Sequence, residues 1–158
     1  MRPGRVATRL LRVDVAAFAT ILDDNGWVLL IRRHDLDAWE APGGGVEDGE
    51  SPWEAVVRET REETGLAVHV EGLTGLYWRP TKPALVLQFI CRVVEGTPTP
   101  TEEAAKLSYF PVDAMPERLA PVVGERIRDS LGATVILRTQ DGPGAREFIA
   151  SLIRRSST

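Results

Sequence analysis

The segment SPWEAVVRETREETG, from Ser51 to Gly65, carries the signals of both ends of an α-helix. Ser51 and Glu54 have the spacing of a capping box, and Pro52 occupies the first helical position, where an N–H is not needed. Gly65 stands where a left-handed residue commonly ends a helix. The sequence therefore predicts a helix from Pro52 to Thr64.

The predicted helix has one stripe of mainly apolar side chains. At about 100° per residue, these side chains fall close enough together to face a protein core. The residues of the stripe are Trp53, Val56, Val57, Thr60 and Thr64.

Three carboxylates, Glu59, Glu62 and Glu63, gather on another side of the helix. Glu59 is a helical neighbour of both other acids, and each such like-charge pair destabilises an exposed helix by about 0.2–0.5 kcal/mol. Arg58 lies four residues before Glu62, but neither Glu59 nor Glu63 has a basic residue three or four positions away. A divalent cation would compensate these charges, because Mg²⁺ prefers carboxylate and water oxygens.

The loop before the helix, PGGGVEDGE from Pro42 to Glu50, is rich in glycine. Consecutive glycines let the backbone come close to a ligand, and a helix N-terminus favours phosphate. A glycine-rich loop alone is weak evidence for a site. Combined with the acidic helix side, it predicts a site for a metal–phosphate complex.

Length and charge limit the classes of protein. The chain has 158 residues and no internal repeat, so we expect a single domain over residues 1–158. The net charge of −4 provides no basic field for nucleic acid, and we expect no nucleic-acid partner. The single cysteine, Cys91, excludes an internal disulfide, and its apolar context predicts a buried strand residue.

The amino terminus invites comparison with a secretory signal, because Arg2, Arg5, Arg9 and Arg12 precede VDVAAFATIL. Asp14 interrupts the apolar run, which then continues into a turn, so we expect no signal peptide. No stretch approaches the roughly 18 apolar residues of a membrane span. We therefore expect a cytoplasmic protein without a membrane partner.

The remaining elements follow from turn and periodicity signals. Asn25-Gly26, a dipeptide that tolerates positive φ at both positions, predicts a tight hairpin turn between strands at 12–22 and 27–33. A loop should follow as far as Glu50. Further strands are expected at 67–80 and 84–96 and within 107–119, then a helix from Pro121 to Leu131.

The carboxyl-terminal region predicts a strand at 133–139 and a helix to about residue 155. One face of this helix is apolar, and we expect it to pack on the domain or on a second copy. The residues of that face are Ala145, Phe148, Ile149, Leu152 and Ile153.

The spacing of the glycines and acids resembles the Nudix box, the signature of the Nudix (MutT-like) hydrolase family. Gly44 is followed after five residues by Glu50, and after seven more by Arg58-Glu59-Thr60, one residue, Glu62-Glu63, one residue, and Gly65-Leu66. Thr60 is the one departure, since the family usually has an aliphatic residue there. A pattern of this length is highly specific.

The resemblance extends over roughly residues 12–120, including LLIRR, WEAPGGG and TEEAAKLSYFPVDAMPE. It implies an α+β fold, the Nudix-type α/β/α sandwich around a mixed β-sheet. The strand and helix at about 133–155 are less typical, and we interpret them as a subgroup-specific addition. Because relatives are often dimers, a homodimer is also an expectation.

The family resemblance implies roles for particular residues. Glu59, Glu62 and Glu63 would be catalytic residues that hold Mg²⁺ or Mn²⁺, with Glu59 preferred as general base. The carbonyl of Gly43 or Gly44 would complete the coordination. Arg58 and Glu50 would form a structural ion pair. A further acid from a later loop is expected at Glu103, and Glu102 is a poorer candidate.

The implied activity is hydrolysis of a diphosphate bond in a nucleoside diphosphate linked to another group. ADP-ribose and nucleoside triphosphates are favoured weakly, because Pro80 and Pro83 only bracket the position of a proline typical of ADP-ribose hydrolases. Substrate contacts are expected from aromatic and basic residues near the loop. These are Arg32, Arg33, Trp39, Tyr77, Trp78 and Arg79.

Two alternatives remain open on the sequence. A Nudix-type domain can bind a nucleotide or nucleotide sugar without cleaving it, although such domains typically lose box glutamates that this chain retains. An isopentenyl-diphosphate isomerase shares the fold but needs a catalytic cysteine, and Cys91 in an apolar strand fits that role poorly.

Overall fold

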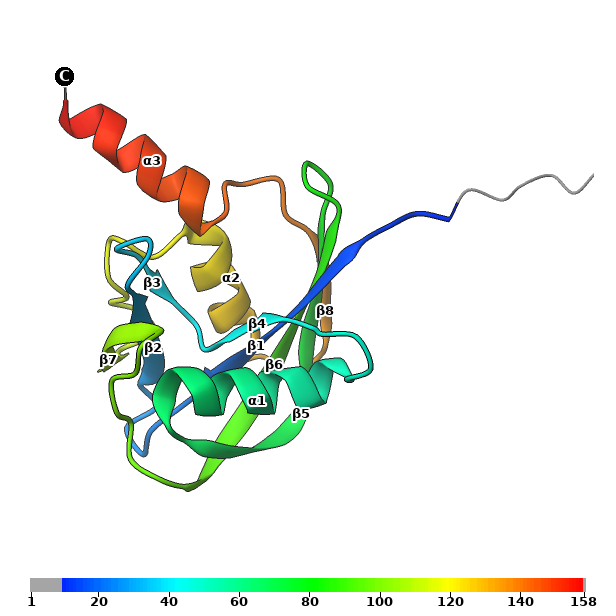
Figure 1. The fold of residues 1–158 in the computed structure, drawn as a ribbon, viewed down its shortest axis with the longest axis vertical. Helices are drawn as coiled ribbons and strands as arrows, with labels where there is room; N and C mark the ends of the chain where they lie inside the picture. Colours follow the sequence, from blue (N-terminus) through cyan, green and yellow to red (C-terminus); the bar gives the residue numbers. More distant parts are fainter. Residues whose placement is uncertain (1–9, 158) are drawn as a thin grey trace, which may run out of the picture.

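The computed structural model describes residues 10–157, so Arg2, Arg5 and Arg9 lie outside the described residues. Five strands form the larger sheet (Figure 1). In spatial order they are β4 (Gly43–Gly45), β1 (Asp14–Ile21), β6 (Ala84–Glu95), β5 (Ala67–Arg79) and β8 (Ile136–Thr139). The sheet is mixed, because β1 and β6 pair in parallel while β5 and β6 pair antiparallel.

A smaller antiparallel sheet has the order β3-β2-β7. Its strands are β3 (Trp39–Glu40), β2 (Val28–Arg33) and β7 (Ala104–Phe110). The helices are α1 (Pro52–Thr64), α2 (Pro121–Asp129) and α3 (Ala145–Ser156). No helix among residues 10–157 is long and apolar enough to cross a membrane.

Alternation along β1 divides the core into two layers. Ala17, Ala19 and Ile21 belong to the cluster that includes Val56 of α1. Phe18 contributes to the second cluster, which includes residues of α2 and of the smaller sheet. Because successive strand side chains point to opposite faces, β1 contacts a helix on each side. The α/β/α sandwich around a mixed sheet is therefore confirmed, with α1 and α2 as its outer layers (Figure 1).

Helix α1 begins and ends where the sequence predicted. The Ser51 hydroxyl accepts from the Glu54 N–H, the Glu54 carboxylate accepts from the Ser51 N–H, and Gly65 has φ 73°. The predicted core stripe needs correction, because Trp53 is 58% exposed whereas Ala55 is fully buried. The helix is rotated so that its acidic side packs against β4, a contact that helical periodicity alone does not reveal.

Thr60, the departure from the box pattern, is fully buried, and its hydroxyl has no hydrogen-bond partner. A buried hydroxyl without a partner destabilises a fold by about 1–3 kcal/mol. We expect Thr60→Val, which replaces that hydroxyl with a methyl group, to stabilise the protein by about 1 kcal/mol without changing activity. Urea unfolding measures the change, and an unchanged or lower midpoint would contradict it.

The predicted hairpin at Asn25-Gly26 forms only at its tip. Gly26 has φ 77°, whereas Asn25 is not among the described residues with positive φ. The Asp23 carboxylate instead accepts from the Asn25 and Trp27 N–H groups, which gives a longer turn. Strands β1 and β2 then separate into different sheets, because β4 and β6 already occupy both edges of β1.

Other element predictions were close, with two differences. The segment predicted as a loop up to Glu50 contains the short strands β3 and β4. The face of α3 packs only near its start, where Ile149 is buried and Phe148 contacts the second core cluster. Ile153 is 58% exposed, and the rest of α3 projects away from the domain (Figure 1). Cys91 is buried in β6, as predicted.

Candidate active site

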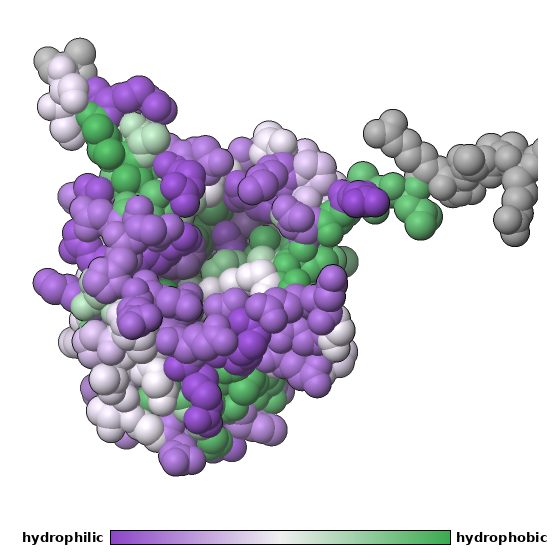
Figure 2. All heavy atoms as spheres, in the orientation of Figure 1, coloured by the Kyte–Doolittle hydropathy of each residue, from purple (hydrophilic) through white to green (hydrophobic). Residues whose placement is uncertain are grey.

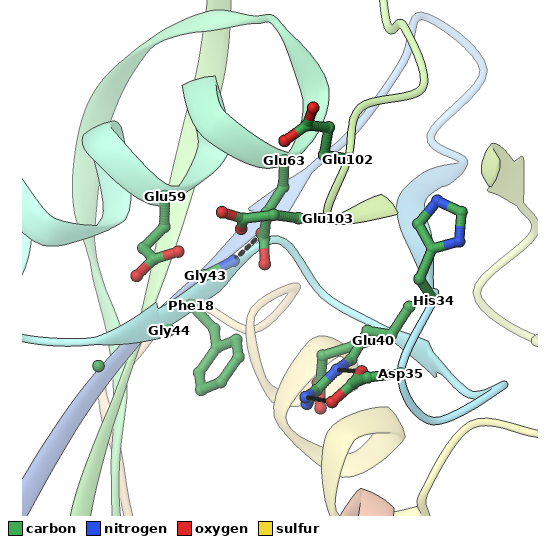
Figure 3. Close-up of a pocket in the computed structure, with 12 residues that line it drawn as sticks. Phe18, His34, Asp35, Glu40, Gly43, Gly44, Glu59, Glu63, Glu102 and Glu103 are labelled. Atoms are coloured by element: carbon green, nitrogen blue, oxygen red, sulfur yellow. Dashed lines mark hydrogen bonds and ion pairs between the residues drawn. The ribbon is translucent and has the colours of Figure 1, made fainter. Parts of the chain in front are cut away.

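A cavity of about 500 Å³ lies between α1, β4 and the residues just before β7 (Figure 3). Figure 2 shows a hollow on this face of the molecule, framed by hydrophilic residues. The cavity is lined by Phe18, Arg33, His34, Asp35, Glu40, Gly43, Gly44, Gly45, Glu59, Glu63, Glu102 and Glu103. Acids and glycines therefore form most of its wall.

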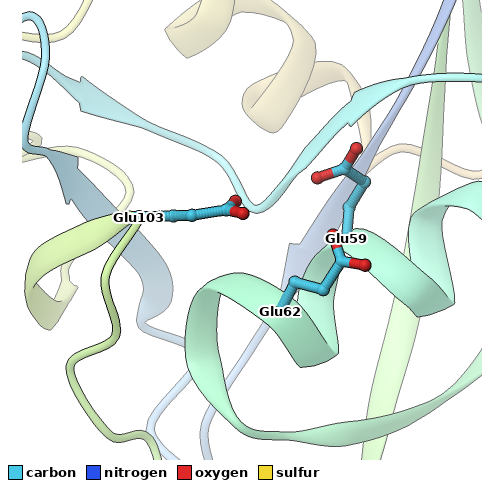
Figure 4. A group of neighbouring side chains, drawn as sticks. All are labelled: Glu59, Glu62 and Glu103. Atoms are coloured by element: carbon cyan, nitrogen blue, oxygen red, sulfur yellow. The ribbon is translucent and has the colours of Figure 1, made fainter.

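Three carboxylates converge beside this cavity. Oxygens of Glu59, Glu62 and Glu103 all lie within 4.8 Å of one another (Figure 4). Helix α1 supplies Glu59 and Glu62, and the segment just before β7 supplies Glu103 from much further along the chain. Carboxylate oxygens at this spacing suit a hard divalent cation, whose charge would offset their mutual repulsion.

Glu63, the remaining box acid, lies deeper than this cluster. Its side chain is 8% exposed, and its carboxylate accepts a 2.8 Å hydrogen bond from the Gly43 N–H. Burial raises the pKa of Glu63 to about 8, and the nearby charges of Glu59 and Glu103 act in the same direction. Burial also raises the pKa of Glu59. Both groups therefore hold a proton more strongly than an exposed glutamate does.

Gly43 and Gly44 allow β4 to run directly against β1 and α1. Gly43 has φ 146°, and a Cβ there would lie 2.2 Å from the Ala17 carbonyl oxygen. A Cβ on Gly44 would lie 2.7 Å from Oε1 of Glu59. Only glycine leaves this space beside the carboxylate, so the glycine-rich sequence positions Glu59 as much as it shapes the loop.

Gly44→Ala is expected to lower kcat/KM by at least about 10-fold with little change in melting temperature. The added methyl group displaces the flexible end of Glu59 rather than the backbone, and Gly44 does not have a positive φ. Gly45→Ala is the matched control, because a Cβ there meets no atom within 4 Å. Equal kinetics for the two variants would contradict the role given to Gly44.

Arg58 connects the loop, the helix and the acids. Its guanidinium donates to Glu50 at 2.7 and 3.0 Å, to Glu59 at 3.0 Å, to Glu62 at 3.1 Å and to the Gly45 carbonyl. These bonds lower the pKa of Glu50 to about 2 and raise that of Arg58. The Arg58–Glu50 ion pair expected from the resemblance is present. Glu59 also has a cationic neighbour, which spacings of three and four could not reveal.

Most of the predicted substrate contacts do not line the cavity. Trp39 is 8% exposed and packs edge-on against Phe110, with ring centroids 4.9 Å apart. Tyr77 is fully buried, and its hydroxyl donates to Asp129. Both aromatic rings therefore serve as core residues here, and Trp78 is likewise absent from the lining.

Of the three predicted arginines, Arg33 alone lines the cavity. Arg33 donates twice to Asp35, at 2.9 and 2.8 Å. Arg32 forms an ion pair with Asp37 instead, and Arg79 donates to the Gly142 carbonyl. Arg33 is thus the predicted cation that shares the cavity with the acids.

Sequence reasoning missed five cavity residues, Phe18, His34, Asp35, Glu40 and Gly45. Phe18 sits in an apolar strand pattern that does not distinguish a cavity wall from a core. Glu40 is 8% exposed, and burial raises its pKa. Asp35 follows Arg33 by two positions, and this acid beside a basic pair was the only available signal.

The donor set fits a magnesium or manganese ion. Glu59, Glu62 and Glu103 offer oxygens within one cation's reach, and the absent side chain at Gly44 keeps the neighbouring backbone close to Glu59. Glu63 lines the same cavity as Gly43 and Gly44 and accepts from the Gly43 N–H. The layered fold and this site together define an α+β protein whose cavity carries a carboxylate cluster suited to a divalent cation.

Comparisons with known proteins agree with this class. The NUDIX domain family model matches residues 11–129. The chain is 37% identical over 130 residues to a MutT-like protein of Streptomyces ambofaciens, covering 82% of this chain and 84% of that protein. It is 33% identical over 116 residues to an ADP-ribose pyrophosphatase of Methanocaldococcus jannaschii, covering 69% of each. A NUDIX hydrolase structure from Nitrosomonas europaea superposes with a TM-score of 0.74 at 20% identity, covering 84% of this chain and 81% of that one.

The chain therefore belongs to the Nudix family. It is an enzyme acting on phosphorus-containing anhydrides, and the family's substrates are small nucleotide-type molecules. The family match ends at residue 129, before β8 and α3. The resemblance recognised in the sequence is thus confirmed.

Proposed function

We propose that this enzyme hydrolyses the diphosphate bond of a nucleoside diphosphate linked to another group, such as ADP-ribose or a nucleoside triphosphate, with Mg²⁺ or Mn²⁺. The convergence of Glu59, Glu62 and Glu103 within 4.8 Å, beside a cavity of about 500 Å³, carries the proposal. A diphosphate resists attack because its oxygens repel a nucleophile. A divalent cation bound at this site would neutralise those oxygens and make a water more acidic.

Individual residues around the cavity have separate proposed roles. Glu59 is the proposed general base, because burial raises the pKa of its carboxyl and it belongs both to the carboxylate cluster and to the cavity lining. Arg58 holds Glu59 and Glu62 in place while Glu50 fixes Arg58. Glu63 and the Gly43–Gly44 carbonyls complete the proposed ligand set.

Arg33 is the proposed phosphate contact. It lines the same cavity as Glu59, and Asp35 fixes its guanidinium through two hydrogen bonds. A guanidinium can donate in parallel to two phosphate oxygens. Acids from α1 and Arg33 from β2 would hold a metal-bound diphosphate in the same cavity. The reaction would consume one water and yield two phosphate monoesters from ADP-ribose, or a nucleoside monophosphate and pyrophosphate from a nucleoside triphosphate.

The name of the M. jannaschii relative supports ADP-ribose among the candidate substrates. A screen separates the candidates by incubating the protein with Mg²⁺ and ADP-ribose, nucleoside triphosphates, dinucleoside polyphosphates or NADH. We expect a mononucleotide product, detected by ³¹P NMR, that disappears with EDTA. Binding of these compounds without any product would instead favour a non-catalytic recognition domain.

Glu103→Gln and Glu102→Gln form a matched pair for the metal assignment. Both acids line the cavity, but Glu103 alone belongs to the cluster with Glu59 and Glu62. We expect Glu103→Gln to raise the Mg²⁺ concentration needed for half-maximal activity by about 10-fold or more, and Glu102→Gln to change it little. A larger effect of Glu102→Gln than of Glu103→Gln on this Mg²⁺ concentration would assign the metal ligand to Glu102 instead.

A further inference from the structure

Phe18 is the aromatic residue that the described chain places in the cavity wall. It comes from β1, it is half-buried, and its ring lies between β4 and α2 (Figure 3). A Cβ on Gly43 would lie 2.8 Å from Cδ1 of Phe18, so the ring rests against the glycine strand. The same strand that supports Glu59 therefore supports an aromatic surface in the same cavity.

Arg126 of α2 fixes this ring from the protein side. Its guanidinium carbon lies 5.4 Å from the centroid of Phe18 and 6.0 Å from that of Tyr77. Arg126 is 6% exposed, and its Nε donates to the Val122 carbonyl of its own helix. No carboxylate in residues 10–157 lies within ion-pair distance of it. Contact between a buried cation and aromatic rings stabilises one ring orientation.

Glu40 gives the same part of the cavity a polar edge. Its side chain lines the cavity, and one carboxylate oxygen accepts from the Ala41 N–H at 3.2 Å. Its second oxygen makes no hydrogen bond with any described residue. A buried acceptor beside an aromatic ring can pair with an N–H group on a ligand edge, whereas the acceptor oxygens of a phosphate have no hydrogen to donate to it.

We propose that Phe18 and Glu40 form the nucleobase subsite of this enzyme. The base stacks on the cavity side of Phe18 while one of its N–H groups donates to Glu40, and Arg126 is a positioning residue behind the ring. This inference rests on the proposed function, because it assumes that the diphosphate lies among Glu59, Glu62 and Glu103. Phe18 thus takes the role of aromatic substrate contact that the sequence had suggested for Trp39 and Tyr77, both of which are buried in the core.

A sugar or a phosphate fits this subsite less well than a base. A sugar presents several hydroxyl groups that each need a partner, whereas Phe18 offers an apolar face and Glu40 one open acceptor. Every nucleobase has a π-face and at least one N–H donor on its edge. Loss of such stacking typically weakens binding by about 5–150-fold per base.

The test compares mononucleotides with ribose 5-phosphate, which lacks a base. Isothermal titration with AMP, GMP, CMP, UMP and ribose 5-phosphate in Mg²⁺ is expected to show at least one mononucleotide binding about 10-fold tighter. Phe18→Ala should remove most of that difference and leave ribose 5-phosphate affinity unchanged. Phe18→Tyr, which keeps an aromatic ring, should retain the wild-type difference. Glu40→Gln should change the order among the four bases.

Two controls separate stacking from folding. Phe18→Leu keeps an apolar side chain but no π-face, so it should behave as Phe18→Ala in binding while retaining the wild-type melting temperature. Trp53→Leu removes an aromatic residue that is 58% exposed and does not line the cavity, and it should leave mononucleotide affinity unchanged. With a cleaved substrate, Phe18→Leu should raise KM by about 10-fold and leave kcat within a few-fold.

The subsite and the proposed function fail in different ways. Equal affinity of wild-type protein for all mononucleotides and ribose 5-phosphate, or full base preference in Phe18→Leu, would overturn the subsite while hydrolysis could stand. Base-dependent binding without cleavage of any diphosphate would overturn the proposed function and leave the subsite supported. The binding measurement needs no turnover, so the two outcomes remain distinct.

Discussion

Glu63→Gln is expected to lower kcat by about 10²–10⁴-fold while the chain still folds. Glutamine retains an oxygen that can accept the 2.8 Å hydrogen bond from the Gly43 N–H, so the local packing survives. It loses the negative charge that the proposed metal site uses beside Glu59 and Glu103. The measurement is kcat in saturating Mg²⁺ on the substrate identified by the panel, with the melting temperature as the check on folding.

A surface acid gives the comparison for this variant. Glu71 of β5 pairs with Arg92 of β6, and the Glu71 side chain is 44% exposed. Glu71→Gln removes the same charge, away from the cavity lining, and should keep kcat within about two-fold. Near-normal turnover by Glu63→Gln would show that Glu63 is not needed for catalysis, and the metal assignment would have to exclude it.

The parts of the fold that the sequence predicted well depend on local signals. Helix α1 has a capping box at Ser51 and a left-handed glycine at Gly65, and both act within a few residues of the helix ends. Strands β5 and β6 were found because long alternating or apolar runs lie between turn residues. The prediction of a β1–β2 hairpin was wrong because β4 and β6, rather than β2, pair with the two edges of β1.

The candidate site also combines residues that local sequence signals predicted with residues that only the tertiary fold brings together. The acids of α1 were recognised as a group because helical spacing brings them together. Glu103 came only from the family resemblance, since its approach to Glu59 depends on how the segment before β7 crosses α1. Phe18 and Glu40 could not be separated from core residues, because residues on a strand face can meet either a helix or a cavity.

The aromatic candidates show the limit of choosing ligand contacts by residue type. Trp39 and Tyr77 have the size and polar groups expected of stacking residues, yet both find partners inside the protein. Tyr77 lies on β5, the strand between β6 and β8, and its hydroxyl reaches Asp129 of α2. Such long-range pairing has no local signature, so only the assembled layers reveal which aromatic ring remains in the cavity.

The acidic site also implies a cost in stability when no metal is bound. Glu63 has a folded-state pKa of about 8, raised from an ordinary value of 4.5 by burial. A raised pKa means that the folded protein binds this proton more tightly than the unfolded chain does. The associated stability is therefore fully present below about pH 4.5 and is lost as pH rises through about 8.

Glu63→Gln is accordingly expected to be more stable than the metal-free wild type at pH 8.5, by about 1–3 kcal/mol, although it is the less active protein. Its advantage should shrink towards pH 5, where wild-type Glu63 is mostly protonated. Urea unfolding in EDTA at pH 5, 7 and 8.5 measures the difference between the two proteins, so that other titrating groups cancel. Mg²⁺ at pH 8.5 should stabilise the wild type more than the variant, because binding to the folded state alone adds stability. A stability difference that is independent of pH would show that the pKa of Glu63 is the same in the folded and unfolded states. The electrostatic reason for placing a cation beside Glu63 would then be lost.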